Sequence, residues 1–222
     1  MSGELIIMRH GRSVFNEQGR YAGWLDTPLS PAGHAEAIDA GRALGAIRCG
    51  FDVAVSSALM RARDTLDLVL GEAGPAGRVV RDWRLNERHY GAMQGLTLEE
   101  GRSVVGEAAA SRLMTDFDAR PPATPAPALA DGEPFSETLD EAGDRAHAAW
   151  REHGEPAWLE GGRVVLVAHG GVLRALLVRL GAVSVQEARG VRLGTAVPMR
   201  VTPEIGVEPC IETCGDSFTG WT

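Results

Sequence analysis

The sequence predicts an α/β fold, a three-layer sandwich in which a mostly parallel central sheet is flanked by helices. Two features of the sequence predict it, the spacing of its apolar segments and its helix start signals. Short apolar segments typical of buried strands alternate along the chain with longer segments that carry helix start signals. Strands that alternate with helices in this way form parallel sheets covered on both faces. The chain has 222 residues, which suffice for one sizeable core, so we expect one domain over residues 1–222.

The predicted elements begin with a short buried strand at Leu5–Met8. The polar, glycine-containing stretch Gly11–Pro28 that follows predicts a loop. A helix should come next and extend to about Ile47, because Ser30 suits an N-cap and Pro31 suits the first helical position.

The middle of the chain predicts two further strands and two helices. Asp52–Ser56 has a strand pattern, and Ser57 would cap a helix over Ala58–Leu70. Arg78–Arg81 predicts a third strand. Thr97–Glu100 has the Ser/Thr-x-x-Glu form of a capping box, so another helix should start there.

The last part of the chain opens with a segment, Ala119–Pro134, that is rich in proline and alanine. It predicts a loop or flap rather than a linker between domains, since the elements after it complete the fold. These elements are a helix from about Glu137 to His153, a strand at Arg163–Ala168, a helix from about Val172 to Leu180, and two weaker strands at Val197–Thr202 and Gly206–Ile211.

Composition limits the classes of partner. The net charge of −8 argues against nucleic acid and against an anionic membrane, because both attract basic surfaces. All 22 basic residues are arginine, so a phosphate site must consist of arginine, histidine and backbone N–H groups. The apolar runs are too short for a membrane span, no signal peptide pattern is present, and three cysteines do not make a disulfide framework. We therefore expect a cytoplasmic protein.

Two His-Gly dipeptides occupy equivalent places in the predicted fold. His10 follows the first apolar strand, Leu5–Met8. His169 follows a later one, Arg163–Ala168. Ligands of open α/β sheets bind beyond the carboxyl ends of the strands, so both histidines lie where chemistry is expected and could face each other. The glycine after each histidine lets a ligand approach the backbone closely.

Charged residues predicted near the same edge indicate phosphoryl transfer. Arg9 precedes His10, and Arg61 lies in the first turn of the helix after the second strand. Two arginines and two histidines would surround a dianionic phosphoryl group with charge and directional donors. Neutral imidazole is nucleophilic at pH 7, so His10 can accept the phosphoryl group directly. An alkoxide leaving group needs a proton donor, and Glu87 in a polar loop is the candidate.

Several short motifs occur together and in order. They are Arg9-His10-Gly11, Ser13-Val14-Phe15-Asn16, Gly23-Trp24, Leu29-Ser30 with Gly33, Ser57 with Arg61-Ala62, the block Leu85–Gly95, and Ala168-His169-Gly170. This ordered set resembles the histidine phosphatase superfamily, specifically its branch of cofactor-dependent phosphoglycerate mutases, and implies a phosphoglycerate mutase-like fold. The resemblance runs from about Leu5 to Pro198, and the block Leu85–Gly95 is similar to the mutase form rather than to the general phosphatase form.

The resemblance implies a role for each matched residue. His10 would be the phosphorylated nucleophile, and Glu87 would protonate the leaving oxygen and later activate the acceptor. The phosphoryl oxygens would be held by Arg9, Arg61 and His169. The substrate side would be lined by Asn16, Gly23, Arg88, Tyr90 and Gly170. No metal and no cofactor are implied, except 2,3-bisphosphoglycerate as activator if the enzyme is a mutase. A homodimer is compatible with the resemblance.

Departures from the mutase pattern fall on one part of the site. Leu98 stands where mutases carry a lysine, and Met114 and Thr115 stand where they carry a pair of arginines. Arg112 and Arg120 are nearby but out of register. In the mutases these cations hold the carboxylate and the second phosphate of phosphoglycerates. We therefore expect a substrate that lacks one of these anionic groups, or a displaced arginine that replaces the lost cations.

Three functions fit these observations. The first is hydrolysis of the phosphomonoester of a small phosphorylated metabolite through phosphohistidine, because a phosphatase only needs water to reach the intermediate, whereas a mutase must retain a bisphosphorylated species. The alternative is a 2,3-bisphosphoglycerate-dependent phosphoglycerate mutase, which the block Leu85–Gly95 favours. The third is a non-catalytic phospholigand-binding protein, against which the intact set of His10, Arg61, Glu87 and His169 argues.

Overall fold

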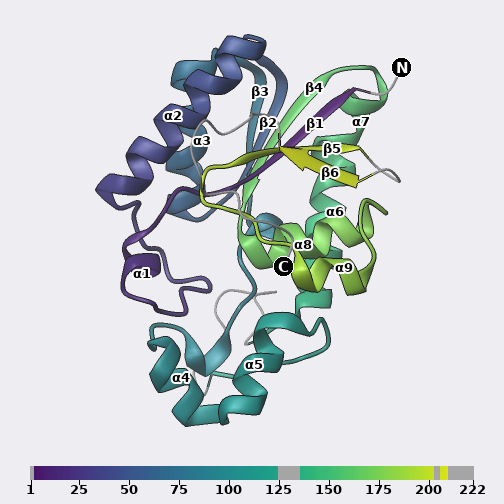
Figure 1. Ribbon diagram of the computed structural model, residues 1–222. Coiled ribbons are helices and arrows are strands. Elements are labelled where there is room, and N and C mark those ends of the chain that lie inside the picture. The colour runs from purple at the N-terminus through teal and green to yellow at the C-terminus, as the bar shows by residue number, and fades with distance from the viewer. Residues whose placement is uncertain (1–2, 125–135, 203–205, 210–222) are drawn as a thin grey trace.

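A computed structural model describes residues 3–124, 136–202 and 206–209 of the chain (Figure 1). Six strands in this part form one sheet in the order β3-β2-β4-β1-β5-β6. The pairs β3-β2, β2-β4 and β4-β1 are parallel, and the pairs β1-β5 and β5-β6 are antiparallel. The strands are β1 (Glu4–Arg9), β2 (Phe51–Ser57), β3 (Ala76–Asp82), β4 (Arg163–Ala168), β5 (Pro198–Thr202) and β6 (Gly206–Pro209).

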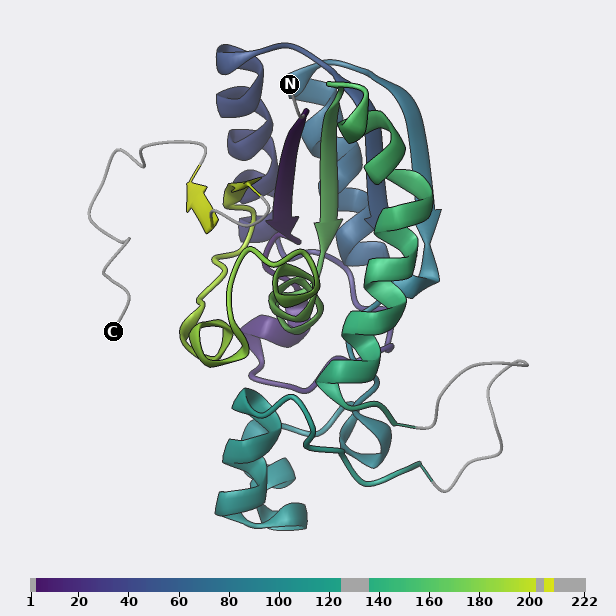
Figure 2. The same cartoon turned by 90° about the vertical axis from the view of Figure 1, so that its right-hand side faces the viewer.

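Helices cover both faces of this sheet, as Figures 1 and 2 show. The helices α2 (Pro31–Ile47) and α3 (Met60–Ala73) pack on one face. The helices α6 (Leu139–His153) and α8 (Gly170–Arg179) pack on the other. The predicted three-layer α/β sandwich with a mostly parallel sheet is thereby confirmed.

The strand β1 shows why its sequence is an uninterrupted apolar run. Successive side chains of a strand point to opposite faces of the sheet. Ile6 and Met8 belong to the core beneath α2 and α3, whereas Leu5 and Ile7 belong to the core beneath α6 and α8. Because both faces are buried, the four central positions Leu5–Met8 are all apolar, and the charged residues Glu4 and Arg9 occur only at the half-buried ends of the strand.

Two predicted helix starts are confirmed and two are corrected. α2 begins at Pro31 behind an N-cap at Ser30, and α4 (Leu98–Val105) begins behind the capping box of Thr97. The prediction that Ser57 caps α3 is wrong, because α3 has Leu59 at its N-cap. Ser57 is instead the last residue of β2. The helix α8 begins at Gly170, two residues before the predicted start, so that His169 is its N-cap.

The predicted loop over residues 11–28 contains a short helix, α1 (Val14–Glu17). A capping box formed by Ser13 and Asn16 stabilises its N-terminus. The sequence also did not predict α5 (Glu107–Thr115), α7 (Glu155–Leu159), α9 (Val185–Gly190), or the 3-10 turns η1 (Trp83–Leu85) and η2 (Gly91–Met93). Most of these elements are one or two turns long, and isolated helices of that length are not stable by themselves. Their positions therefore depend on tertiary contacts.

The helices α4 and α5 lie apart from the two helix layers, beyond the carboxyl ends of β1, β2 and β4 (Figures 1 and 2). Gly106, with a φ of +82°, separates the two helices. We call residues 98–115 the distal helix pair. The ends of the strands and the distal helix pair enclose the region that contains the predicted site.

Part of the predicted flap and of the last strand lies outside the described residues. Residues 119–124 have neither helix nor strand structure, whereas residues 125–134 of the flap and residues 210 and 211 of the last predicted strand are not described. In the described ranges, no helix has the length and apolar character needed to cross a membrane.

Candidate active site

The two histidines of the His-Gly dipeptides meet at the carboxyl ends of β1 and β4. Arg9 lies opposite Ala168 in the parallel pairing, and the backbone N–H of His10 donates to the carbonyl of Ala168 at 3.0 Å. The ring centroids of His10 and His169 are 5.0 Å apart. Both side chains are buried. The strand register thus brings two residues that are far apart in the sequence into direct contact.

The hydrogen bond of His10 fixes which of its ring nitrogens can react. Nδ1 lies 2.7 Å from the carbonyl oxygen of Gly11. A carbonyl oxygen can only accept, so Nδ1 carries the hydrogen and the lone pair of the neutral ring is on Nε2. Burial, together with the nearby charges of Arg61 and Arg9, lowers the pKa of His10 well below its ordinary value, although the bond to Gly11 opposes this shift. The His10 ring is therefore neutral at pH 7 and has a free lone pair on Nε2, which is the state that a nucleophile needs.

His169 is oriented by a chain of hydrogen bonds behind the site. The hydroxyl of Ser57 and the backbone N–H of Ala58 both donate to Oδ1 of Asn86, at 2.9 and 3.1 Å. The Ser57 oxygen is left to accept from Nε2 of His169 at 2.8 Å. Burial and the charge of Arg61 lower the pKa of His169 well below its ordinary value. The ring is thus neutral, and its buried Nδ1 has no hydrogen-bond partner among the described residues.

Arg9 and Arg61 are held by backbone carbonyls, and the Nε of each keeps its hydrogen free. Arg9 donates from Nη1 to Leu193 at 3.3 Å. Arg61 donates from Nη1 to Leu25 at 3.0 Å and from Nη2 to Gly23 at 2.8 Å. In the described part of the structure, the Nε atoms of both arginines are buried without a partner. Burial lowers the pKa of Arg61 to about 10, although the charges of Glu87 and Asp26 oppose this shift, so Arg61 remains charged at pH 7.

Glu87 is held by the backbone around it. Its Oε1 accepts from the backbone N–H of Arg88 at 2.9 Å. Its own carbonyl accepts from the indole of Trp24 at 2.6 Å and from Nη2 of Arg145 at 2.9 Å. Glu87 lines the same cavity as Arg9, His10 and Arg61, so the loop presents a carboxylate to the reacting groups.

Arg145 is a functional residue that the sequence interpretation missed. Its Nη1 donates to the carbonyls of Arg84 and Asn86, both at 2.7 Å, and its guanidinium pairs with Glu137 at 2.7 Å. Together with its bond to Glu87, Arg145 ties down the loop that carries the carboxylate. A signal was present in the sequence, because Arg145 lies three residues after Ala142 and four before Ala149, two buried residues of α6. It is therefore a charge next to the apolar face of a helix.

The reacting groups open into a cavity of about 560 Å³. Four of the five residues expected on the substrate side line it, namely Asn16, Gly23, Tyr90 and Gly170. Arg88 does not. Its guanidinium donates to the carbonyl of Leu113 and stacks on the ring of Tyr90, with 4.6 Å from Cζ to the ring centroid. The structure therefore brings Arg88 to the wall behind Tyr90, and His169 likewise lies behind His10 rather than on the cavity surface.

The positions that depart from the mutase pattern line this cavity. Leu98, Met114 and Thr115 all form part of its wall, on the distal helix pair. Arg112 and Arg120, the two displaced arginines considered from the sequence, do not line it. Arg112 pairs with Asp116 at 3.0 Å, and Arg120 donates to the carbonyl of Ser136 at 2.7 Å and pairs with Glu141. Neither arginine replaces the lost cations.

Comparisons with known proteins agree with this geometry. The model of the histidine phosphatase superfamily (branch 1) matches residues 5–206. The 2,3-bisphosphoglycerate-dependent phosphoglycerate mutase of Hamiltonella defensa is 36% identical over 210 residues, which cover 88% of this chain and 84% of that protein. The protein of the same name from Mesorhizobium japonicum is 36% identical over 200 residues, which cover 90% and 91%.

Solved structures of similar fold include a protein named as a phosphatase rather than a mutase. A mycobacterial glucosyl-3-phosphoglycerate phosphatase, solved with VO3, superposes with a TM-score of 0.73 at 28% identity and covers 96% of this chain and 100% of that one. A structure from Bacillus stearothermophilus superposes with a TM-score of 0.73 at 23% identity and covers 95% and 96%, a likeness of fold alone. The relatives thus carry the names of both a mutase and a phosphatase.

Proposed function

The chain belongs to the histidine phosphatase superfamily, branch 1, and we propose that it is a phosphatase that hydrolyses the phosphomonoester of a small metabolite through a phosphorylated His10. The observation that carries this proposal is the set of free donors around the His10 ring, the buried Nε atoms of Arg9 and Arg61. Buried donors without partners are costly, and a phosphoryl group between the arginines would satisfy both of them.

The first half of the proposed reaction transfers the phosphoryl group to the enzyme. Nε2 of His10 attacks phosphorus while Nδ1 keeps its hydrogen bond to Gly11. Arg9 and Arg61 hold the equatorial oxygens and balance the charge of the transition state. The P–O bond to the leaving group breaks, and Glu87 gives that oxygen a proton. The products are an alcohol, phosphohistidine and an ionised Glu87.

The second half returns the enzyme to its starting state. Ionised Glu87 takes a proton from water, whose oxygen attacks phosphorus as the bond to Nε2 breaks, and inorganic phosphate leaves. His169 would assist, because its unpartnered Nδ1 can take the proton that a phosphate monoanion brings into the site and donate it back in a hydrogen bond to a phosphoryl oxygen. The arginines supply the positive charge that Mg²⁺ supplies in other phosphoryl-transfer enzymes, and 2,3-bisphosphoglycerate would enter only in the mutase alternative.

Hydrolysis is preferred to mutase activity because of the cavity wall. Leu98, Met114 and Thr115 replace cations at positions where the family resemblance expects contacts to the distal anionic groups of phosphoglycerates. Each lost charge-assisted contact is worth about 1.5–3 kcal/mol, so a bisphosphorylated intermediate would be retained poorly. The mutase alternative is supported by the names of the 36% identical relatives. A cytoplasmic location is part of the same proposal.

Release of phosphate from 4-nitrophenyl phosphate tests the reaction class. The wild-type protein should release phosphate and form a phosphorylated intermediate that is labile in acid, as a phosphoryl group on nitrogen is. His10→Ala should lose both properties, and His34→Ala, which changes an exposed histidine of α2, should retain them. Full activity of His10→Ala would contradict the phosphohistidine mechanism.

Phosphoglycerate separates the two outcomes for the phosphoryl group. The phosphatase proposal predicts net phosphate release, with no dependence on added 2,3-bisphosphoglycerate. Exchange between 3-phosphoglycerate and 2-phosphoglycerate without net release, stimulated by the bisphosphate, would show that the mutase alternative is correct.

A further inference from the structure

The cavity extends well beyond the reacting groups. Its volume of about 560 Å³ lies within the range of about 300–1,000 Å³ that holds ligands larger than a three-carbon metabolite. Of its described lining residues, five are arginines, whereas the one carboxylate is Glu87. A cavity this basic is notable in a chain of net charge −8. Arg9 and Arg61 belong to the reacting end, and the other arginines lie farther out.

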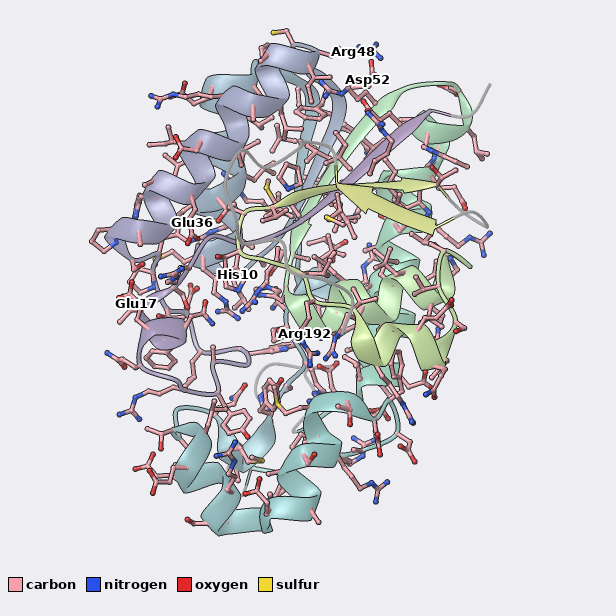
Figure 3. All side chains as sticks on the ribbon, viewed as in Figure 1. His10, Glu17, Glu36, Arg48, Asp52 and Arg192 are labelled. Carbon is pink, nitrogen blue, oxygen red and sulfur yellow. The ribbon has the colours of Figure 1, made fainter. Side chains whose placement is uncertain are left out.

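Two of the outer arginines, Arg174 and Arg192, come from neighbouring parts of the fold. Arg174 lies on α8, and Arg192 follows the end of α9. Arg192 is adjacent to Leu193, whose carbonyl accepts from Arg9. The segment that holds one phosphoryl-binding arginine therefore also presents Arg192 to the cavity. Figure 3 shows His10 and Arg192 in the middle of the molecule, between the sheet and the distal helix pair.

Arg192 differs from most exposed arginines of this chain in having no partner. In the described residues its side chain makes no hydrogen bond and no ion pair, although it is exposed. Arg42, Arg81 and Arg112, in contrast, pair with carboxylates at 3.2, 2.8 and 3.0 Å. Because the chain has more carboxylates than arginines, an unpaired arginine on a cavity wall is a site left open for an anion.

Arg174 is partly buried, lines the same cavity as Arg192, and has few hydrogen-bond partners. Its Nη2 donates to the carbonyl of Met114 at 3.0 Å, and no other hydrogen bond to a described residue is made. Burial lowers its pKa, and the charge of Arg192 adds to this effect, although Tyr90 and Glu87 oppose it. Because both guanidinium groups line the same cavity, an anion bound between them would offset the repulsion of their charges.

An apolar surface faces the same space. Phe15, Leu98 and Met114 line the cavity, and 40% and 43% of the surfaces of Leu98 and Met114 are exposed. Exposed apolar side chains that line a cavity together with convergent charged groups are typical of small-molecule sites. The outer cavity therefore offers one charged surface and one apolar surface to the same ligand.

We propose that Arg174 and Arg192 form a second anion subsite, and that the substrate is a phosphomonoester whose partly apolar body carries a carboxylate. The inference rests on the proposed function, since the first phosphoryl group must occupy Arg9 and Arg61. The second anion binds at Arg174 and Arg192, and the apolar part packs on Phe15, Leu98 and Met114. The subsite thus lies on α8 and the segment after α9 rather than at the positions that mutases use.

Matched aryl phosphates test the subsite. Each probe carries a side chain of increasing length that ends in a carboxylate or in the corresponding carboxamide. Wild-type protein should prefer the carboxylate at the length that reaches Arg192, with kcat/KM about tenfold higher than for the amide. Arg192→Gln should remove most of this preference, and Arg192→Glu should reverse it.

A control variant and two contrary outcomes separate the subsite from the proposed function. Arg189→Gln changes a nearby arginine that pairs with Asp116 at 3.6 Å and does not line the cavity, so it should keep the wild-type preference. Turnover of the probes without a carboxylate preference at any length, or with the same preference in Arg192→Gln, would overturn the subsite alone. Absence of turnover of every probe would instead contradict the proposed function.

Discussion

The two ends of the cavity are built in opposite ways. At the inner end, His10 and Arg61 are 3% and 1% exposed and are fixed by hydrogen bonds to backbone carbonyls. At the outer end, Leu98 and Met114 are 40% and 43% exposed, and Arg192 has no partner among the described residues. His10 and Arg61 lie where elements that share the two cores end or begin, whereas much of the outer wall comes from α1, the distal helix pair and the segment after α9.

This difference separates the reaction from the choice of substrate. Phosphoryl transfer needs donors held in place before the reaction begins, and buried strand ends provide that order. Recognition of the rest of the substrate can rely on exposed side chains, which can be exchanged without disturbing the cores. Changes at the inner end should therefore affect kcat strongly, and changes at the outer end should affect substrate preference by smaller amounts.

The largest effect is expected for Glu87→Gln. Gln can still accept from the backbone N–H of Arg88, but it cannot protonate a leaving alkoxide. Loss of a general acid lowers the rate by about 10²–10⁴-fold. The loss in kcat/KM should be large for alkyl phosphates and small for 4-nitrophenyl phosphate, whose leaving group needs no proton. This constant reports the phosphorylation of His10 alone, whereas kcat also contains the second half of the reaction, in which Glu87 is the base. Glu99→Gln on α4, outside the cavity, is the control. Equal losses with both substrates would rule out Glu87 as the donor.

The next effect concerns the support of this carboxylate. Arg145→Met leaves Glu137 buried without its partner, and the removal of one member of a buried ion pair costs about 3–5 kcal/mol. Urea unfolding should show this loss. Because Arg145 also holds the carbonyl of Glu87, kcat should fall more for alkyl phosphates than for 4-nitrophenyl phosphate.

Two further variants separate positioning from general destabilisation. Glu137→Gln combined with Arg145→Met removes the unpaired charge and should recover part of the stability, while the selective loss on alkyl phosphates persists. Arg151→Met changes an exposed arginine of the same helix and should alter neither property. If the double variant recovered alkyl phosphate hydrolysis as well, Arg145 would have only a structural role.

Arg145 also shows where sequence interpretation stops. His10, Arg9, Arg61 and His169 could be predicted because each lies at the end or start of an element whose type is visible locally. The local pattern marks Arg145 only as a charge next to the apolar face of a helix. It cannot identify the backbone carbonyls that Arg145 binds, which are about sixty residues away in the sequence. The same holds for the outer wall, since the approach of Arg192 to the cavity depends on how the chain after α9 folds back.

Ser57 illustrates a second kind of failure. A serine before an apolar helical pattern fits an N-cap as well as any local rule can decide. In the structure the strand continues through Ser57, and its hydroxyl donates to Asn86 and accepts from His169. The hydrogen bond to His169 prevails because it satisfies the buried Nε2–H of the imidazole. Leaving that donor without a partner would cost more free energy of folding than leaving the N-terminus of α3 without a side-chain cap.

Acidification should lower the free energy of unfolding, because two buried histidines at the inner end of the cavity stay neutral in the folded protein but gain protons in the unfolded chain. His10 and His169 are neutral in the folded protein because burial lowers their pKa values, whereas in the unfolded chain each titrates near 6.5. Below that pH the unfolded state binds more protons, so stability is complete above about pH 6.5 and falls as the pH decreases.

The expected slope is about 1.4 kcal/mol per pH unit for each histidine. Urea unfolding between about pH 5 and pH 7 measures it, above the range in which carboxylates titrate. His169→Gln should reduce the slope, and saturating inorganic phosphate should oppose the loss, because the bound anion favours the protonated imidazole. A stability that is constant over this range would show that the two rings are not neutral in the fold.

The smallest effect is expected at the outer end. Leu98→Lys restores a cation at an exposed position of the cavity wall, and exposed charge pairs contribute about 0.2–1 kcal/mol. KM for 3-phosphoglycerate should therefore fall by about two- to fivefold at low salt, while KM for 4-nitrophenyl phosphate, which has no distal anion, should stay the same. Val104→Lys adds the same charge on α4 at a residue that does not line the cavity and should change neither constant. A fall in KM for both substrates, or a large fall in kcat, would show that the outer wall is coupled to the reacting groups and that the two ends do not act separately.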